Sequence, residues 1–168
     1  MERKIVYPQS SEIEETNKMA AVLFGTDEDK TQAQPTLENA LRLIALEKNN
    51  FICLKEGGKI IAWSVVMPTS QKEMERFLKE EINEKELFEI SIEHPSFEAL
   101  YLMAVIVLPE YRKQGIGSSL MKQQIEYFKG KYGIEKLYAF VLTEEGKGLI
   151  GALEKNLQVT IPFLRKAG

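Results

Sequence analysis

The chain has 168 residues, a formal net charge of −3 at pH 7 and one cysteine, Cys53. Hydrophobic residues make up 44% of it and charged residues 28%, proportions that are typical of a globular protein and exclude a disordered chain. At this length we expect one domain with a sizeable core. The acidic balance argues against a nucleic-acid partner, and a single cysteine excludes an internal disulfide.

No segment of the sequence suits a membrane or a metal. The longest apolar stretch, residues 99–108, is far shorter than the roughly 20 residues that a membrane-spanning helix needs. The amino terminus lacks the apolar segment of a secretory signal. Histidine, cysteine and aspartate residues show no metal-ligand spacing. We therefore expect a cytoplasmic protein with no membrane partner and no metal.

The first third of the chain predicts a short strand and two helices. Residues 4–7 have the character of a strand, and Ser11 with Glu14 has the pattern of a capping box that starts a helix. Residues 25–34 are polar and predict a loop. A second helix follows, and its predicted buried stripe consists of Leu37, Leu41, Ile44 and Ala45.

A hairpin and a helical segment follow in the middle of the chain. Strands 51–55 and 59–67 flank the tight-turn sequence Glu-Gly-Gly at 56–58. Residues 71–96 then hold apolar side chains at helical spacing and predict a helical insert before the next strand. Residues 97–108 are almost continuously apolar, which is typical of a strand covered on both faces.

The last third predicts two more helices around a strand. Residues 116–132 have the pattern of an amphipathic helix, and residues 136–143 that of a strand. Residues 145–156 predict a weaker helix with an irregular start, because glycine lowers helix stability. Residues 158–164 allow a last short strand. The inner face of the first of these helices should hold Ile116, Leu120, Met121, Ile125 and Phe128.

Residues 107–118, with the sequence Val-Leu-Pro-Glu-Tyr-Arg-Lys-Gln-Gly-Ile-Gly-Ser, are the most informative part of the chain. They join the apolar strand to the following helix through a turn. Unpaired N–H groups at a helix start, together with the positive end of the helix dipole, bind phosphate. Gly115 and Gly117 let the backbone approach a ligand closely, and Arg112 and Lys113 add positive charge. The segment therefore predicts a site for a pyrophosphate or polyphosphate.

The order Arg112-x-x-Gly115-x-Gly117, after Val-x-Pro-Glu-Tyr, resembles the GNAT superfamily of acyl-CoA-dependent N-acetyltransferases. The resemblance covers nearly the whole chain and implies a single domain over residues 1–168. The implied fold is α/β (an α+β sandwich) and GNAT-like, with a central mixed, mostly antiparallel sheet and helices on both faces. The helical insert at 71–96, between the third and fourth strands, is an addition to the plain family fold.

The resemblance also implies acetyl-CoA as the co-substrate and assigns residues to it. The turn would bind the pyrophosphate, and the fourth strand would pair with the pantetheine arm through the backbone of Val105 and Val107. The Val105 amide would also donate to the thioester carbonyl as an oxyanion hole. The residues expected at the pyrophosphate are Arg112, Lys113, Gln114, Gly115, Ile116, Gly117 and Ser118.

The sequence determines the proton chemistry less well. An attacking amine is protonated at neutral pH and needs a base. Some family members carry a carboxylate on the fourth strand where this chain has Tyr101. The candidates are therefore Tyr101 as a proton relay, Glu98 and His94, although a histidine before a proline also suits an ordinary loop. Many members protonate the leaving thiolate with a later tyrosine, but none follows Tyr138 here.

Residues 71–98 carry nine acidic and four basic side chains, a net charge of −5, while the rest of the chain carries +2. An acidic insert beside the acceptor site would attract a cationic small-molecule amine or a peptide amino group. The simpler alternative is a solvated helix face.

Transfer of an acetyl group to a primary amine, by direct attack in a ternary complex, is the leading functional hypothesis. The alternative is a catalytically weak acyl-CoA-binding or sensor domain, which the missing carboxylate and tyrosine favour. A Rossmann-type nucleotide site is disfavoured, because it needs a third glycine where Leu120 stands. An exposed edge strand near the carboxyl end makes a homodimer a further possibility.

Overall fold

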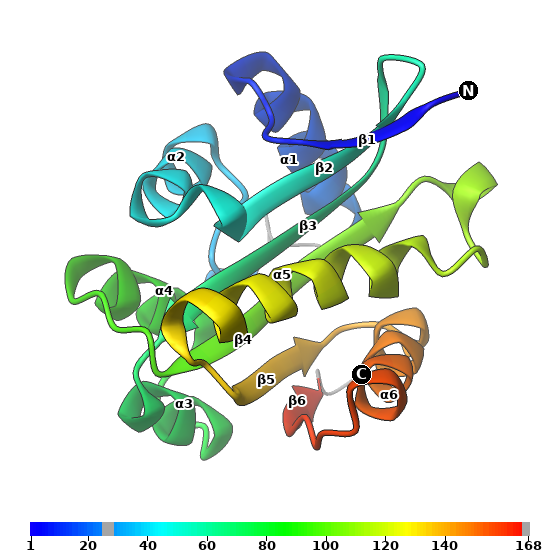
Figure 1. Ribbon diagram of the computed structural model, residues 1–168. Helices are drawn as coiled ribbons and strands as arrows, with labels where there is room; N and C mark the ends of the chain where they lie inside the picture. The colour runs from blue at the N-terminus through cyan, green and yellow to red at the C-terminus, as the bar shows by residue number, and fades with distance from the viewer. Residues whose placement is uncertain (25–28, 166–168) are drawn as a thin grey trace.

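The computed structural model describes residues 1–24 and 29–165, so part of the loop predicted at 25–34 lies outside the described residues. In the described part, six strands form one sheet in the order β1-β2-β3-β4-β5-β6 (Figure 1). The pairs from β1 to β4 are antiparallel and the pairs from β4 to β6 are parallel, which confirms a mixed, mostly antiparallel sheet. The strands are β1 (Arg3–Val6), β2 (Phe51–Glu56), β3 (Lys59–Thr69), β4 (Ala99–Val107), β5 (Lys136–Val141) and β6 (Phe163–Arg165).

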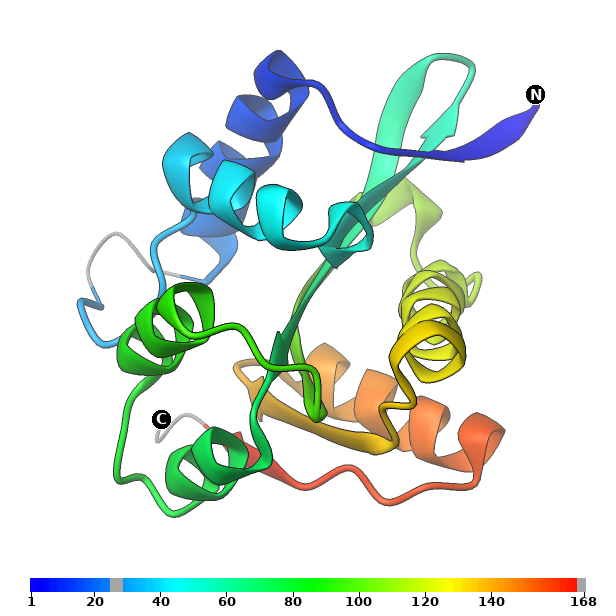
Figure 2. The same ribbon diagram turned by 60° about the vertical axis from the view of Figure 1, so that its left-hand side comes forward.

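Helices cover both faces of this sheet, as expected. Figure 2 shows the sheet nearly edge-on, with α1 to α4 on one side and α5 and α6 on the other. Helices α3 and α4 lie between β3 and β4 in the chain, where the helical insert is predicted. The helices are α1 (Ser10–Phe24), α2 (Leu37–Leu46), α3 (Gln71–Leu78), α4 (Glu84–Glu93), α5 (Ile116–Tyr132) and α6 (Glu144–Leu157), with short 3-10 turns η1 (Lys48–Asn50) and η2 (Pro109–Tyr111).

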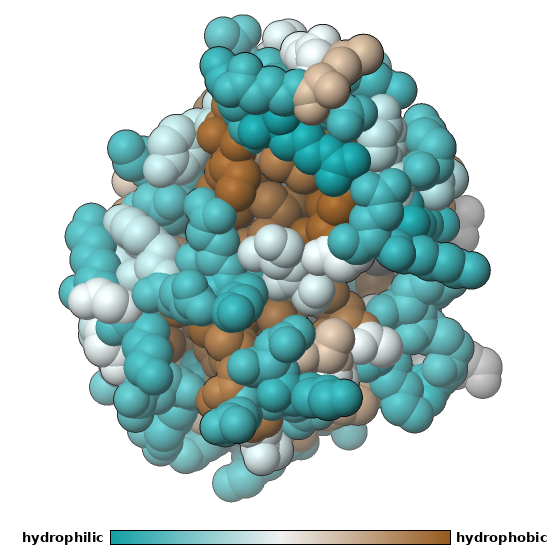
Figure 3. All heavy atoms as spheres, turned by 45° about the vertical axis from the view of Figure 1, so that its right-hand side comes forward, coloured by the Kyte–Doolittle hydropathy of each residue, from teal (hydrophilic) through white to brown (hydrophobic). Residues whose placement is uncertain are grey.

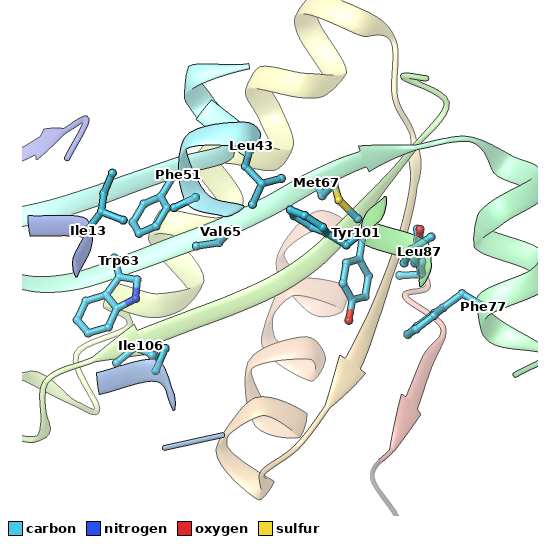
Figure 4. Close-up of a cluster of buried hydrophobic side chains, with 14 of the residues drawn as sticks. Ile13, Leu43, Phe51, Trp63, Val65, Met67, Phe77, Leu87, Tyr101 and Ile106 are labelled. Carbon is cyan, nitrogen blue, oxygen red and sulfur yellow. The ribbon is translucent and has the colours of Figure 1, made fainter. Parts of the chain in front are cut away.

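Strands β3 and β4 form the centre of the molecule. Residues 61–69 of β3 and 99–102 of β4 are buried on both faces, which confirms the interpretation of the long apolar run for the first half of β4, whereas residues 103–105 and 107 are only partly buried. The inner face predicted for α5 is buried at all five positions. Figure 4 shows Tyr101 of β4 close to Phe77 of α3 and Leu87 of α4 in the core, and Phe51, Val65 and Trp63 along β2 and β3.

The start of α1 differs from the prediction. Gln9 N–H donates to Glu12 Oε1 at 2.9 Å, so the helix begins before Ser11 and the capping box predicted at Ser11 and Glu14 is wrong. Glu12 also pairs with Lys55 of β2 at 2.6 Å. The cap by Glu12 is local, because this residue lies three positions after Gln9.

The buried face of α2 also differs in part. Leu41 is 43% exposed and Ala45 is also exposed, whereas Ala40 and Leu43 are 5% and 4% exposed. The helix contacts both α1 and α4, so its buried face is set by two neighbours. Thr36 caps its start by accepting the N–H of Asn39 at 3.1 Å.

The insert consists of two separate helices. Ser70 caps α3, and a capping box of Asn83 and Glu86 starts α4. Arg42 of α2 forms two hydrogen bonds to the carboxylate of Glu89 on α4, at 2.9 and 2.8 Å. This bidentate pair fixes the insert against α2.

A buried carboxylate joins the two helical layers at one end of the sheet. Glu47, directly after α2, accepts hydrogen bonds from Tyr127 at 3.1 Å and from Tyr132, and pairs with Lys131 at 3.4 Å. Burial alone would raise the pKa of Glu47, but hydrogen bonds from Tyr132, Asn49 and Tyr127 lower it to about 2. All three partners on α5 therefore tie that helix to the end of α2.

Helix α6 starts regularly, so the irregular start predicted from its glycines is wrong. Thr143 accepts the N–H of Gly146 at 3.0 Å, and Glu144 and Glu145 place negative charge in the first turn. Cap and charge together offset the low helix propensity of glycine.

Candidate active site

Strands β4 and β5 pair along only part of their length. Residues 99–102 of β4 pair in parallel with residues 136–139 of β5. β4 continues to Val107, and no described residue pairs with its later part on the β5 side. The two strands therefore diverge and leave a gap beyond Leu102.

A β-bulge marks the start of this gap. Two consecutive residues of β3 pair with Leu102 and Ala104, so Met103 is the extra residue of β4. The bulge shifts the alternation of side chains along the strand. Met103 and Ala104 both pack toward the layer of α1 to α4, whereas Val105 packs toward α5 and α6.

The backbone groups of Val105 and Val107 point into the gap. Leu108 N–H donates to the Ile61 carbonyl on β3 at 2.9 Å. Successive residues of a strand direct their N–H and C=O groups to opposite neighbours, so those of Val105 and Val107 face away from β3. Arg112 Nε donates to the Val107 carbonyl at 3.0 Å and so brings its guanidinium to the mouth of the gap.

Helix α5 begins beside the gap with open backbone groups. Gly115 stands at its N-cap with φ 74°, and Lys113, two residues earlier, has φ 64°. Gly115 has no side chain that could accept hydrogen bonds from the first N–H groups of the helix. A Cβ on Gly117 would lie 3.4 Å from Val105 Cγ2, at ordinary van der Waals contact, so α5 packs directly against β4 here.

A cleft of about 760 Å³ runs from this gap between α5 and α6. Figure 3, which brings the right-hand side of Figure 1 forward, shows apolar residues gathered in hollows that hydrophilic residues surround. The Gln114 side chain does not line the cleft but turns to β1, where its Oε1 accepts from Arg3 at 3.1 Å. The other predicted cofactor residues line it: Val105, Val107, Arg112, Lys113, Gly115, Ile116, Gly117 and Ser118.

Gly115→Ala should lower the free energy of unfolding by about 1–2 kcal/mol, because alanine is strained in the left-handed region. Gly130→Ala, inside the same helix, should instead raise it by up to about 1 kcal/mol. No atom lies within 4 Å of a Cβ placed at Gly130. Urea denaturation of both variants tests this, and equal stability of the two would contradict the expectation.

A second cavity, of about 90 Å³, lies under α1, α2 and α4. Its walls come from these helices, from the segment before α2 and from β2, β3 and β4. Met103, Ala104 and Leu142 border both this cavity and the cleft. The two spaces therefore meet at the bulge of β4.

Glu84, the first residue of α4, lines the second cavity. Its Oε2 accepts from the Tyr101 hydroxyl at 2.5 Å, and its Oε1 accepts from Ala33 N–H at 2.9 Å. Burial raises the pKa of Glu84, and the nearby Asp29 carboxylate raises it further. The two hydrogen bonds lower this pKa, but the effect of burial is larger. Burial also raises the pKa of Tyr101 well above its usual range. Tyr101 is fully buried and does not line the cavity, so it contacts Glu84 from behind the cavity wall.

The other two base candidates lie elsewhere. Glu98 accepts from Gln71 N–H at 3.1 Å, and so caps α3. It precedes Met103 by five residues, roughly 17 Å along an extended strand. His94 is exposed at the end of α4. Neither Glu98 nor His94 is among the described residues that line the two spaces.

Sequence reasoning missed Glu84, which it counted only as one of the acidic residues of the insert. The available signal was Asn83 with Glu86, a capping pattern that places Glu84 in the first turn of a helix. That pattern gives no information about which cavity the first turn faces.

Helix α6 forms one wall of the cleft through residues that include Glu145, Gly148 and Leu149. It contains no tyrosine, so a phenol is missing from this wall. Among the described residues, no helix is both long and apolar enough to cross a bilayer.

Comparison with known proteins places this geometry in a family. Residues 14–157 match the model of the acetyltransferase (GNAT) family. No curated protein matches the chain by sequence.

Several solved structures share the fold at low sequence identity. Naa20 from Chaetomium thermophilum, in complex with a bisubstrate analogue, matches with a TM-score of 0.57 and 19% identity, over 92% of this chain and 69% of that one. Diaminobutyrate acetyltransferase EctA from Paenibacillus lautus, in complex with L-2,4-diaminobutyric acid and coenzyme A, matches with a TM-score of 0.57 and 12% identity, over 95% and 78%. The loading GNATL domain of CurA from Lyngbya majuscula matches with a TM-score of 0.56 and 18% identity, over 86% and 67%. The family match covers most of the chain, so this protein belongs to the acetyltransferase (GNAT) family.

Proposed function

We propose that this protein transfers an acetyl group from acetyl-CoA to a primary amine by direct attack in a ternary complex. The observation that carries the proposal is the meeting of two spaces at Met103 and Ala104. The larger space suits an extended ligand and borders open helix N–H groups, whereas the smaller contains a carboxylate. A thioester and an amine bound in the two spaces would face each other across the bulge.

The residues of the cleft suit acetyl-CoA. The pyrophosphate would accept hydrogen bonds from the N–H groups at the start of α5, and Arg112 and Lys113 would add charge. The pantetheine arm would lie in the gap between β4 and β5 and pair with the backbone of Val105 and Val107. The coenzyme A in the EctA complex supports the same co-substrate here.

In the proposed step, the amine nitrogen attacks the thioester carbonyl carbon, so a C–N bond forms and the C–S bond breaks. The amine enters as an ammonium ion, and Glu84 takes the proton that frees its lone pair. Tyr101 is a positioning residue that holds this carboxylate. The Val105 amide would donate to the carbonyl oxygen as negative charge develops on it.

The nitrogen loses a second proton to a water molecule as the amide forms, and coenzyme A leaves as a thiolate that gains a proton. The thiolate would take this proton from water, since α6 supplies no tyrosine. A thiol with a pKa near 8.5 is a tolerable leaving group without a general acid.

Incubation with acetyl-CoA and a panel of primary amines should release free thiol and yield products heavier by one acetyl group. Calorimetry should first detect binding of acetyl-CoA. Binding without thiol release from any amine would favour the catalytically weak binding or sensor domain. Absence of binding would reject both functions.

A further inference from the structure

Two amide side chains in the small cavity have N–H donors without partners among the described residues. They are Asn17 on α1, through Nδ2, and Gln32, through Nε2. The Gln32 side chain is deeply buried, with 3% of the residue exposed. A buried donor without a partner costs free energy and calls for an explanation.

Two neighbouring amides in the same cavity are already satisfied. Gln34 Nε2 donates to the backbone carbonyls of Asp29 and Gln32, and Asn39 Nδ2 donates to the Gln34 carbonyl. These amides hold the loop before α2 in shape. The unpartnered donors of Asn17 and Gln32 therefore indicate a bound group that accepts hydrogen bonds.

Glu84 and Gln32 line the same cavity, and the Glu84 carboxylate contacts the backbone next to Gln32. Ala33, the next residue after Gln32, donates its N–H to Glu84 Oε1 at 2.9 Å. One small molecule can therefore contact both groups. Among the described residues of the cavity lining, Glu84 alone has an ionisable side chain.

A lining whose described residues supply one carboxylate and no cation disfavours any charge on the ligand other than its ammonium group. A ligand carboxylate would lie near Glu84 with no cation of the lining to compensate it, and like charges in close contact are costly. A second ammonium would find no second carboxylate in the described lining, because the nearby Asp29 lies outside it. The rest of the wall is largely apolar and includes Phe51, Trp63 and Phe88.

We infer that the acceptor is a small primary amine that carries one neutral hydrogen-bond acceptor close to its nitrogen, as in an amino acid amide or an amino alcohol. The inference rests on the proposed function. The amine binds at Glu84, and the neutral carbonyl or hydroxyl oxygen accepts from Gln32 Nε2 and Asn17 Nδ2. The cavity volume of about 90 Å³ limits the portion of the ligand that enters.

Four compounds of similar size test the inference. Alaninamide and alaninol carry a neutral acceptor, alanine carries a carboxylate, and sec-butylamine carries no acceptor. The kcat/KM values for the first two should exceed those for the last two by about tenfold or more. Saturation-transfer NMR with coenzyme A present should give the same order of binding without any turnover.

Removal of each donor should abolish the preference. Gln32→Leu and Asn17→Leu should each lower binding of alaninamide and alaninol by about tenfold and leave sec-butylamine unchanged. Gln123→Leu, at an exposed glutamine on α5, is the matched control and should change nothing. Unchanged affinity for acetyl-CoA would show that each variant is folded. Because Asn17 and Gln32 lie on different segments, the test remains possible if one of the two variants does not fold.

The outcomes separate the inference from the proposed function. Equal binding of all four compounds, or an unchanged preference in both donor variants, would overturn the inference even where acetyl transfer occurs. If the four compounds bind with the expected ranking of affinities but none of them releases thiol, the proposed function is rejected. The inferred selectivity of the cavity would then still stand.

Discussion

Replacement of Glu84 by glutamine should lower kcat/KM for acetyl transfer by about 10²–10⁴-fold, because a positioned general base contributes that much. Glutamine keeps the shape of the side chain but cannot take the proton of the ammonium ion. Tyr101→Phe should cause a smaller loss of about tenfold, because it removes one hydrogen bond that holds the carboxylate. Glu93→Gln, at the exposed end of the same helix, is the matched control for steady-state kinetics.

The pH profile provides an independent test of the same role. The base acts only when ionised, so kcat/KM should fall as the pH drops through the pKa of Glu84, which burial raises above its usual range. The groups that face this carboxyl are the Tyr101 hydroxyl, the Ala33 N–H and the Asp29 carboxylate. The acid limb should vanish in Glu84→Gln. Survival of this limb would place the base elsewhere, with Glu98 and His94 as the next candidates.

Glu47→Gln should lower the free energy of unfolding by about 3 kcal/mol. The usual pKa of 4.5 falls to about 2 in the folded protein, and each unit corresponds to about 1.4 kcal/mol. This loss is a large part of the roughly 5–15 kcal/mol that stabilises a typical domain. Urea denaturation at neutral pH measures it. Glu126→Gln, which removes an exposed partner of Lys122 on α5, should cost at most about 0.5 kcal/mol.

The stabilisation by Glu47 should depend on pH in one direction. Its folded pKa lies below the unfolded value, so the contribution is complete above about pH 5 and is lost as the pH falls toward 2. The parent should therefore lose stability across this window more steeply than Glu47→Gln. Parallel acid sensitivity of the two proteins would show that Tyr127, Tyr132 and Lys131 do not hold the carboxylate in its charged form.

Features carried by consecutive residues followed from the sequence. The almost continuous apolar run predicted β4 as a strand, buried on both faces in its first half, and helical spacing predicted the inner face of α5. The hairpin with its turn at 56–58 and the insert between β3 and β4 also followed from residues close together in the chain. The interactions that produce each of these patterns therefore lie within one short segment.

Predictions failed where a second contact outweighs the pattern that was used. The buried face of α2 responds to its two neighbours α1 and α4, which are distant in the chain. The starts of α1 and α6 depend instead on local caps, through Glu12 and Thr143, and the cap by Thr143 outweighs the glycines that predicted an irregular start.

The sequence by itself determined the family and predicted a phosphate-binding turn, because residues 112–118 form one continuous segment whose backbone would create the site. Only the tertiary structure decided which residues line the small cavity that we propose for the acceptor. Asn17, Gln32, Glu84 and Met103 come from four separate parts of the chain. They meet because α4 packs against α2 and because the β4 bulge turns Met103 to their side. Neither the helix packing nor the bulge can be recognised from a periodic pattern in the sequence.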